Sequence, residues 1–293
     1  MSSDSSSEIK VAVSTNVRDE NNILEWIAFH LAVGFDHVFV VDHLSRTPVS
    51  ELVNPEILAS GKVSVVRYEK QTILGTKFHI VNQLCIPHMQ KLKVDWMIHL
   101  DGDEYFNPCL PDHRSVKDFL AGFGKHVHQI AVNWLMFGSN FHDAQPEGLV
   151  LENFIRCQKQ THTLGKTFFR PDSTIGMTNP HYVKLKRNLK NGTVSAFNRK
   201  YYYGHDQLIG LPRVPWQKQP CLINHYHYQS YETYKERQLS RKRDDTGTFK
   251  TARSQTEIHG SISNECINEF LKTHFATKTL EVMGQISRFP EHR

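Results

Sequence analysis

Short apolar runs alternate with helix-like stretches through the first hundred residues of the chain. The runs lie at 9–14, 37–41, 63–66 and 94–100, and each has the length of a buried strand. After the first run, apolar residues recur at helical spacing, at Ile23, Leu24, Trp26, Ile27 and Leu31. Gly34 stands where that helix would end. Strands that alternate with helices are typical of βαβ units, so this pattern predicts a parallel sheet.

The second half of the chain has a less regular pattern. Further strands are expected at 130–137, 166–170, 182–185 and 221–228, and helices at 78–89, 149–157, 231–243 and 267–275. Pro87 is expected to kink or end its helix. We therefore predict a single α/β domain with a mostly parallel central sheet flanked by helices. Within it, a disordered tail (1–8) precedes a nucleotide-binding half (9–110) and an acceptor-binding half with C-terminal helices (111–293).

Composition narrows the class of protein. The 293 residues carry a net charge of +5, which fits an anionic small-molecule ligand at least as well as a nucleic acid. No basic tract interleaved with aromatic residues indicates a nucleic-acid surface. The five cysteines are widely spaced without a CxxC pair, and we expect free thiols in a reducing compartment. No apolar run reaches about 18 residues, so we expect a cytoplasmic protein without a transmembrane segment.

The fourth apolar run ends abruptly in three carboxylates, Asp101, Asp103 and Glu104. In an open α/β sheet, ligands bind beyond the carboxyl ends of the strands. Carboxylates placed there suit Mg²⁺ or Mn²⁺, and such an ion suits a phosphorylated substrate. Taken alone, a DxD motif is as readily explained by a solvated acidic turn after a core strand.

Two further loops would meet at the same edge of the sheet. The loop after the first run carries polar side chains that could contact a base and ribose, namely Thr15, Asn16, Arg18 and Glu20. Helix capping by Asp19 or Asn22 is the alternative explanation of that loop. Asp42 follows the second run and could accept hydrogen bonds from a ribose or base, although an ordinary turn Asp explains it equally well.

A further group lies far downstream. Alternation along the strand expected at 221–228 puts His225 and His227 on one face. An imidazole joined to Asp101 and Asp103 gives a mixed nitrogen and oxygen site that Mn²⁺ accepts. On the following charged helix, Arg237 or Arg241 could contact a diphosphate, although most cations there are explained by a solvated helix face.

Other nucleotide-binding signatures are missing. There is no GxGxxG after the first strand, and Leu164-Gly165-Lys166-Thr167 lacks the first glycine of a P-loop. A metal-dependent nucleotidyltransferase is a competing hypothesis, but it would favour a glycine-rich basic loop where this chain has an acidic one. A non-catalytic nucleotide- or carbohydrate-binding protein also remains open.

Several segments carry a family resemblance: Val17-Arg18-Asp19-Glu20 with Glu25-Trp26, Asp95-Trp96 with Asp101-Gly102-Asp103-Glu104, Trp134 to His142, Lys166 to Pro171 with His181, and Asn224-His225-Tyr226. In this order, from Val11 to Arg241, they resemble the family 92 glycosyltransferases and related glycosyl-transferase-2-like proteins of GT-A fold. Phe141 departs from the pattern, because it stands where the family often has Gly. The membrane anchor of animal members is also not found.

This resemblance implies transfer of a sugar from a nucleotide-diphosphate sugar to a hydroxyl of a glycan acceptor, with inversion. A UDP-sugar is the expected donor, and a hexose such as galactose the expected sugar. A Mn²⁺ or Mg²⁺ ion held by Asp103 and His225, with Asp101 near the metal or the ribose, would stabilise the leaving diphosphate. Arg237 or Arg241 would assist.

The transfer also needs a general base and a platform for the acceptor. The candidate bases are Asp143, Glu147, Glu152 and Asp206, each of which is otherwise explained as a surface carboxylate. We favour Asp143, because it follows the 134–142 segment that should face the acceptor. The candidate acceptor-binding residues are Trp134, Phe141, His142 and His181, with Trp134 and Phe141 as the apolar platform.

Overall fold

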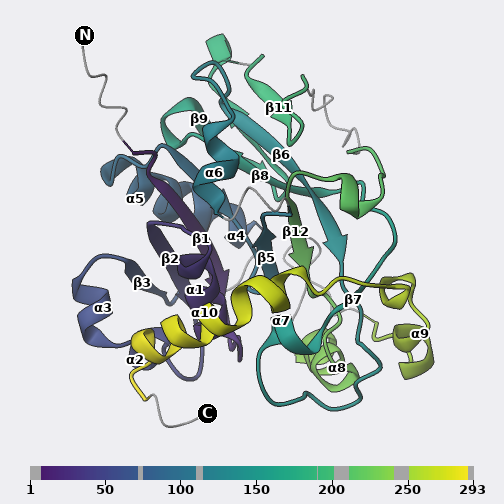
Figure 1. Ribbon diagram of the computed structural model, residues 1–293. Coiled ribbons are helices and arrows are strands. Elements are labelled where there is room, and N and C mark those ends of the chain that lie inside the picture. Colours follow the sequence, from purple (N-terminus) through teal and green to yellow (C-terminus); the bar gives the residue numbers. More distant parts are fainter. Residues whose placement is uncertain are drawn as a thin grey trace.

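A computed structural model describes residues 8–71, 75–109, 115–189, 191–200, 211–240 and 251–289 (Figure 1). The predictions for Asp206 and Arg241 fall outside these residues, as does nearly all of the N-terminal tail. Within the described part, one large sheet holds most strands, and helices lie on both of its faces (Figure 1). The predicted α/β class is therefore confirmed.

The first half of the sheet is parallel. It contains β1 (Val11–Val17), β2 (His37–His43), β3 (Val63–Tyr68) and β4 (Trp96–His99), in the order β3-β2-β1-β4. Each strand overlaps one of the four apolar runs, so the prediction of a strand at each run is confirmed. The polar loops after β1, β2 and β4 therefore open at one edge of the sheet, as expected for parallel neighbours.

The other half of the sheet is mixed. Beyond β4 the order is β8 (Gly165–Phe169), β6 (Gln129–Met136), β12 (Leu222–His225) and β5 (Glu104–Asn107), and β11 (Thr193–Ser195) also pairs with β6. β6 is parallel to β12 and β11, whereas β8 runs antiparallel to both neighbours and β5 antiparallel to β12. β5 was not predicted. Its first residue, Glu104, was taken as part of the acidic group that ends the fourth apolar run, and its other residues follow directly.

Two small sheets flank the large one. β9 (Thr174–Asn179) and β10 (Tyr182–Leu185) form an antiparallel hairpin. β7 (Arg156–Cys157) pairs with β13 (Cys266–Ile267). The helix predicted at 149–157 is therefore wrong in its second part: α7 ends at Asn153, because the following residues form this strand pairing instead.

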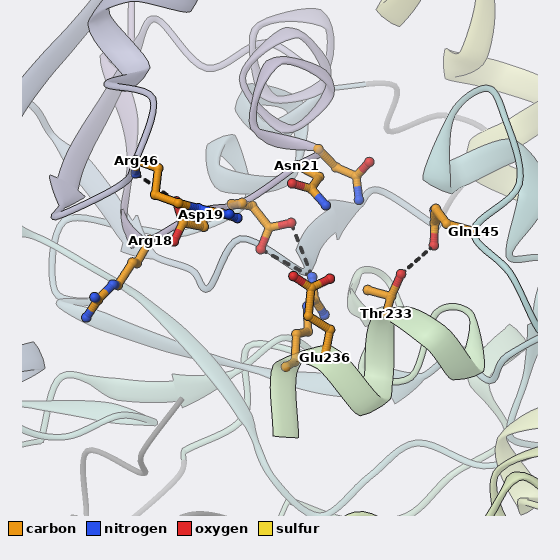
Figure 2. A pocket seen from close by; sticks show the side chains of 10 residues that line it. Arg18, Asp19, Asn21, Arg46, Gln145, Thr233 and Glu236 are labelled. Atoms are coloured by element: carbon orange, nitrogen blue, oxygen red, sulfur yellow. Dashed lines mark hydrogen bonds and ion pairs between the residues drawn. The ribbon is translucent and has the colours of Figure 1, made fainter. Parts of the chain in front are cut away.

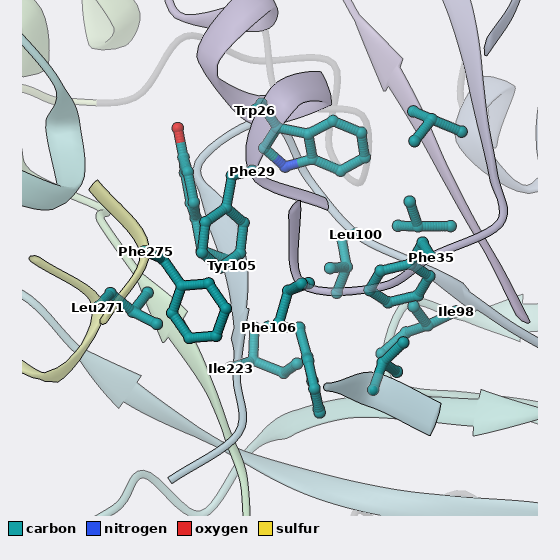
Figure 3. Close-up of a cluster of buried hydrophobic side chains, with 14 of the residues drawn as sticks. Trp26, Phe29, Phe35, Ile98, Leu100, Tyr105, Phe106, Ile223, Leu271 and Phe275 are labelled. Carbon is teal, nitrogen blue, oxygen red and sulfur yellow. The ribbon is translucent and has the colours of Figure 1, made fainter. Parts of the chain in front are cut away.

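One face of the sheet is covered by α1 (Ile23–Ala32) and α10 (Phe270–Ile286), which pack against each other. Figure 3 shows Phe29 of α1 lying between Tyr105 of β5 and Phe275 of α10, with ring centroids 5.1 and 5.8 Å away. Each large apolar side chain buried in this way contributes about 2 kcal/mol to folding. Gly34 follows α1 with φ +103°, a conformation that suits glycine.

The opposite face is covered by one longer helical segment. It runs through α4 (Thr76–Ile80), a π-helical turn (Val81–Cys85) and α5 (Ile86–Lys91). Pro87 lies in the first turn of α5, so of the two predicted outcomes, a kink or an end, the helix does not end there. The π-helical turn before it widens the spacing at the point where a proline ring would meet the preceding turn.

The remaining described helices are short: α2 (Val49–Leu52), α3 (Pro55–Ala59), α6 (Val116–Ala121), α7 (Val150–Asn153), α8 (Tyr231–Ser240) and α9 (Gln255–His259). Across the described ranges, no helix combines the length and the apolar character needed to cross a membrane. All five cysteines are free, as predicted.

Candidate active site

The acidic turn lies between β4 and β5 and is closed by its own hydrogen bonds. The Asp101 N–H donates to the Glu104 carboxylate at 2.9 Å, and the Glu104 N–H donates to the Asp101 carbonyl at 3.0 Å. At Gly102, an added Cβ would lie 3.0 Å from Glu20 Cγ and 3.2 Å from a Val17 methyl, closer than ordinary contact, so these side chains would have to shift. The turn therefore packs tightly against the loop that follows β1.

Two neighbouring side chains of α1 support this turn and a second loop. Trp26 donates its indole N–H to the Glu104 carbonyl at 2.9 Å. Its neighbour Glu25 is buried and accepts the backbone N–H groups of Val150 and Leu151, at the start of α7. Burial raises the pKa of Glu25 to about 8, although these two hydrogen bonds oppose the shift.

One side of the acidic turn faces two lysines. Lys166 of β8 is 1% exposed, and its Nζ lies 3.1 Å from Asp101 Oδ2 and 3.2 Å from Glu104 Oε2. Lys77 of α4 forms a second ion pair with Asp101. Burial opposes ionisation of Asp101, but the two ammonium groups hold its pKa well below the usual range. We call Lys77, Lys166, Asp101 and Glu104 the lysine side.

The other side of the turn faces two histidines and an arginine. One ligand atom from each of Asp103, His225 and His227 lies within 4.8 Å of the others. The β5–β12 register opposes His225 to Glu104, which brings these distant segments together. Arg237 of α8 lies 3.2 Å from Asp103 Oδ2. We call Asp103, His225, His227 and Arg237 the histidine side.

On the histidine side, neighbouring charges shift the pKa values of His225 and Asp103. Burial disfavours the charged form of His225, but the Asp103 carboxylate, 3.6 Å from Nε2, outweighs it and raises the pKa of this imidazole. Burial likewise opposes the ionised form of Asp103, but His225 and Arg237 lower its pKa. The carboxylate of Asp103 is therefore ionised at neutral pH.

The donor set of the histidine side fits a divalent metal ion. It offers a carboxylate and two imidazoles, a combination that Mn²⁺ accepts. Nδ1 of His225 and Oε1 of Glu104 are buried without a hydrogen-bond partner in the described part of the chain. Buried polar atoms are rarely left unpaired, so these two atoms are consistent with a ligand that binds beside them.

A cavity of about 240 Å³ shares Arg237 with the histidine side, and Figure 2 shows side chains that line it. It is lined by Arg18, Asp19, Glu20, Asn21, Asn22, Arg46, Gln145, Thr233, Glu236 and Arg237. Arg237 belongs to both regions, because its guanidinium also lies 3.2 Å from Glu20. Of the residues predicted to bind a nucleotide, Arg18, Glu20 and Arg237 line this cavity.

The other predicted nucleotide-binding residues make contacts within the chain. Thr15 is buried in β1, and the Asn16 side chain accepts a hydrogen bond from His99 at 3.2 Å. Asp42 is 1% exposed, and its oxygens accept from the N–H groups of Ser45 and Val49 and pair with Arg67. Both Asp42 oxygens are thus engaged in holding the loop after β2.

Trp134 of β6 brings several candidate residues together. Its ring centroid lies 4.7 Å from that of His225 and 4.9 Å from that of His181, and Lys166 Nζ lies 5.9 Å from the ring. The indole Nε1 is buried without a hydrogen-bond partner in the described residues. Burial lowers the pKa of His181 to about 4, so its imidazole is neutral at neutral pH and donates Nδ1–H to the Gly165 carbonyl.

The other two acceptor candidates lie on the loop after β6. Phe141 is 52% exposed and lies under the Arg156 guanidinium, 5.1 Å from the ring centroid. Its φ of +64° falls in the left-handed region that glycine adopts most readily. His142 packs its ring against Phe154, with centroids 5.5 Å apart.

The candidate bases occupy different environments. Asp143 is exposed and accepts hydrogen bonds from His259 and Gln255, which lower its pKa. Glu152 caps the start of its own helix, and Glu147 is exposed. Within the described ranges, no hydrogen bond or ion pair joins these three carboxylates to Asp103 or His225.

Sequence reasoning missed Lys77 and Lys166 as site residues. Lys166 is a cation inside an apolar strand. In the sequence it was considered only within the incomplete P-loop pattern and one segment of the family resemblance, without a role of its own. A buried lysine needs a carboxylate partner, and that requirement pointed to the acidic turn. Nothing in the sequence around Lys77 marks it in the same way.

Residues 9–259 match the sequence profile of glycosyltransferase family 92. The chain belongs to this family. It is 22% identical to a family 92 protein of Oryza sativa subsp. japonica over 230 residues and 22% identical to one of Ricinus communis over 232 residues. These alignments cover 78% of this chain but 35% and 37% of the relatives. The chain therefore spans about a third of the length of these family 92 proteins.

Solved structures show looser similarity to this family 92 chain. A glycosyltransferase involved in glycosylation of the PBCV-1 major capsid is 12% identical, with a TM-score of 0.27, over 56% of this chain and 61% of that one. HddC from Yersinia pseudotuberculosis is 8% identical, with a TM-score of 0.31, over 59% and 82%. These scores add nothing to the description of the site, so the family membership rests on sequence.

Proposed function

We propose that this chain is a metal-dependent glycosyltransferase that moves a sugar from a nucleotide-diphosphate sugar to a hydroxyl of a carbohydrate acceptor. Membership of family 92 supports glycosyl transfer. The observation that carries the metal-dependent part is the meeting of Asp103 with His225 and His227 beside the cavity lined by Arg237. UDP as the nucleotide, a hexose such as galactose as the sugar, and inversion are finer parts of the same proposal.

Asp103, His225 and His227 would hold Mn²⁺ or Mg²⁺, which supplies a Lewis acid for the charge that develops on the leaving diphosphate. Arg237 adds a fixed cation at the border between this group and the cavity. Its contacts to Asp103 and Glu20 orient the guanidinium before any substrate arrives. The donor would thus bind with its nucleotide in the cavity and its diphosphate near Arg237.

Trp134 and His181 would provide the apolar platform for a sugar, because an indole face suits the C–H face of a pyranose. Asp143 is the proposed general base. The carbonyls of His142 and Asp143 accept the N–H groups of Tyr231 and Glu232 at 2.9 Å, at the start of the helix that carries Arg237. The loop that carries the proposed base is therefore fixed relative to the histidine side.

A panel of nucleotide sugars, including UDP-galactose, tests this proposal. We expect released nucleotide with a preferred donor in the presence of Mn²⁺ and none after chelation. No release from any donor would reject catalysis and favour a binding protein. Production of pyrophosphate from a sugar phosphate and a nucleoside triphosphate would instead identify a nucleotidyltransferase.

The base assignment has its own test. Asp143→Asn should leave donor binding unchanged and reduce transfer about 100-fold or more, because general base catalysis contributes on that order. Glu281→Gln, at an exposed position of α10, is the matched control. Unchanged turnover in Asp143→Asn would reject Asp143 and move the role to Glu147, Glu152 or Asp206.

A further inference from the structure

The β9–β10 hairpin begins at the proposed acceptor platform and leads away from it. His181, in the turn of the hairpin, contacts the Trp134 ring. Met177, Val183 and Leu185 are buried in a hydrophobic cluster beneath the strands, so the hairpin is firmly attached. Because side chains alternate along a strand, residues 182, 184 and 186 share the opposite side of β10 and its end.

The side of β10 that faces away from the hydrophobic cluster carries exposed cations, and no carboxylate lies among them in the sequence. Lys184, Lys186 and Arg187 are exposed. The 33 residues between Asp172 and Asp206 include six Lys and Arg residues and no Asp or Glu. In the part of the hairpin and its continuation that the structure describes, none of the exposed cations forms an ion pair.

The direction of this cationic row distinguishes it from a solvated patch. Along an extended strand, alternate residues lie about 7 Å apart, so Lys184 and Lys186 extend the acceptor platform in steps, and Arg187 follows at the start of a 3₁₀ turn. The exposed carboxylate nearest in sequence, Asp172, precedes β9, and the β9–β10 register places it near Lys186, at the end of the row away from the His181 turn. A chain that leaves the platform along β10 would therefore meet the charge of Lys184 before it reaches this carboxylate at the far end of the hairpin.

We propose that the β9–β10 hairpin binds an acidic acceptor glycan, whose carboxylate-bearing sugars lie along Lys184, Lys186 and Arg187. This inference rests on the proposed function, because it extends the acceptor site of that function. An anionic membrane is the competing occupant, but it favours apolar side chains inserted among the cations. Ile175, at 63%, is the one large apolar side chain that the described hairpin exposes.

Binding of two labelled trisaccharides to the full chain tests the inference. A galacturonic acid trimer should bind about tenfold more tightly than a neutral galactose trimer at low salt, since three exposed ion pairs together contribute on that order. The preference should shrink at 0.5 M salt, where exposed charges are screened. The variant Lys184→Ser/Lys186→Ser/Arg187→Ser should lose it.

The matched control is Lys62→Ser/Lys91→Ser/Lys278→Ser, which removes the same charge from exposed positions elsewhere. It should keep the preference. Equal binding of the two trimers, or equal loss in both variants, would overturn the inference. So would hairpin-dependent binding to phosphatidylserine vesicles without binding to the acidic trimer, because that result assigns the surface to a membrane.

Donor turnover separates this inference from the proposed function. Nucleotide release from the preferred donor in water is measured for the same variants and should be unchanged, since the hairpin cations lie outside the donor site. Loss of the acidic preference with intact donor turnover rejects only the acceptor class. A clear acidic preference without turnover of any donor supports the binding surface and rejects the glycosyltransferase.

Discussion

Asp101 and Asp103 are two residues apart in one turn, yet their surroundings differ in kind. On the lysine side, Asp101 and Glu104 are matched by Lys77 and Lys166. On the histidine side, Asp103 faces imidazoles that can lose their protons to a metal. The comparison teaches that two aspartates of one DxD sequence can have different partners: Asp101 is paired with lysines of the fold, while Asp103 faces groups that suit a metal.

Burial explains this division. Lys166 and Glu104 are almost completely buried, so their charges are costly unless each keeps its partner. Each side keeps one buried side-chain atom without a hydrogen-bond partner among the described residues, Oε1 of Glu104 and Nδ1 of His225, but the histidine side offers imidazole nitrogens that suit a metal. The lysine side can therefore fix the turn in the absence of ligand, and the histidine side can present ligand atoms from it.

The largest expected effect follows from removal of Lys166. Lys166→Met should lower the free energy of unfolding by about 3–5 kcal/mol, because it leaves the buried carboxylate of Glu104 without its cation. Urea denaturation of the purified chain measures this loss. Lys117→Met is the control, since Lys117 pairs with Glu8 and Asp36 at a more exposed position and should cost about 1 kcal/mol or less. Equal losses in the two variants would remove the basis for the lysine side.

The second prediction contrasts the two aspartates directly. Asp103→Asn should reduce nucleotide release about 100- to 1000-fold, on the order expected when the stabilisation of a developing charge is lost. Asp101→Asn should instead lower stability while Mn²⁺ affinity changes little. Isothermal titration with Mn²⁺ and urea denaturation separate the two properties. The comparison fails if Asp101→Asn abolishes Mn²⁺ binding while Asp103→Asn leaves it intact.

The sequence predicted local features of the chain better than contacts between distant segments. Local periodicity was sufficient for β1 to β4, because each strand is a continuous apolar run. It also drew attention to Asp103 and His225, whose residue types suit a metal. It could not predict that β5 pairs with β12, because that register joins segments more than a hundred residues apart. The Lys166 partners were missed for the same reason.

Candidate bases show a different limit of sequence reasoning. Asp143, Glu147 and Glu152 all carry a carboxylate group, and their surroundings distinguish them. Asp143 contacts His259 of α9, whereas Glu152 caps its own helix. Such contacts depend on how the loop after β6 is folded, which no periodicity records. The fold was therefore more predictable than the catalytic roles.

Metal binding gives the third prediction. Mn²⁺ at 100 times its dissociation constant should stabilise the chain by about 2.7 kcal/mol, provided that the unfolded chain does not bind it. Thermal unfolding with and without Mn²⁺ measures this effect as a rise in Tm. His227→Ala should abolish most of the rise, whereas Lys77→Met should retain it. A rise that survives His227→Ala would place the ion elsewhere.

The smallest expected effect is that of Lys77→Met on stability. Among the residues that the structure describes, Lys77 forms an ion pair with Asp101 alone, and the Asp101 side chain is 36% exposed, so water can replace much of the lost interaction. We expect a loss of about 0.5–1 kcal/mol in urea denaturation, well below that of Lys166→Met. The reason is that Lys166 still neutralises Asp101 from the buried side after the substitution. A loss as large as that of Lys166→Met would show that the two lysines act as one unit, and the lysine side would then depend on both.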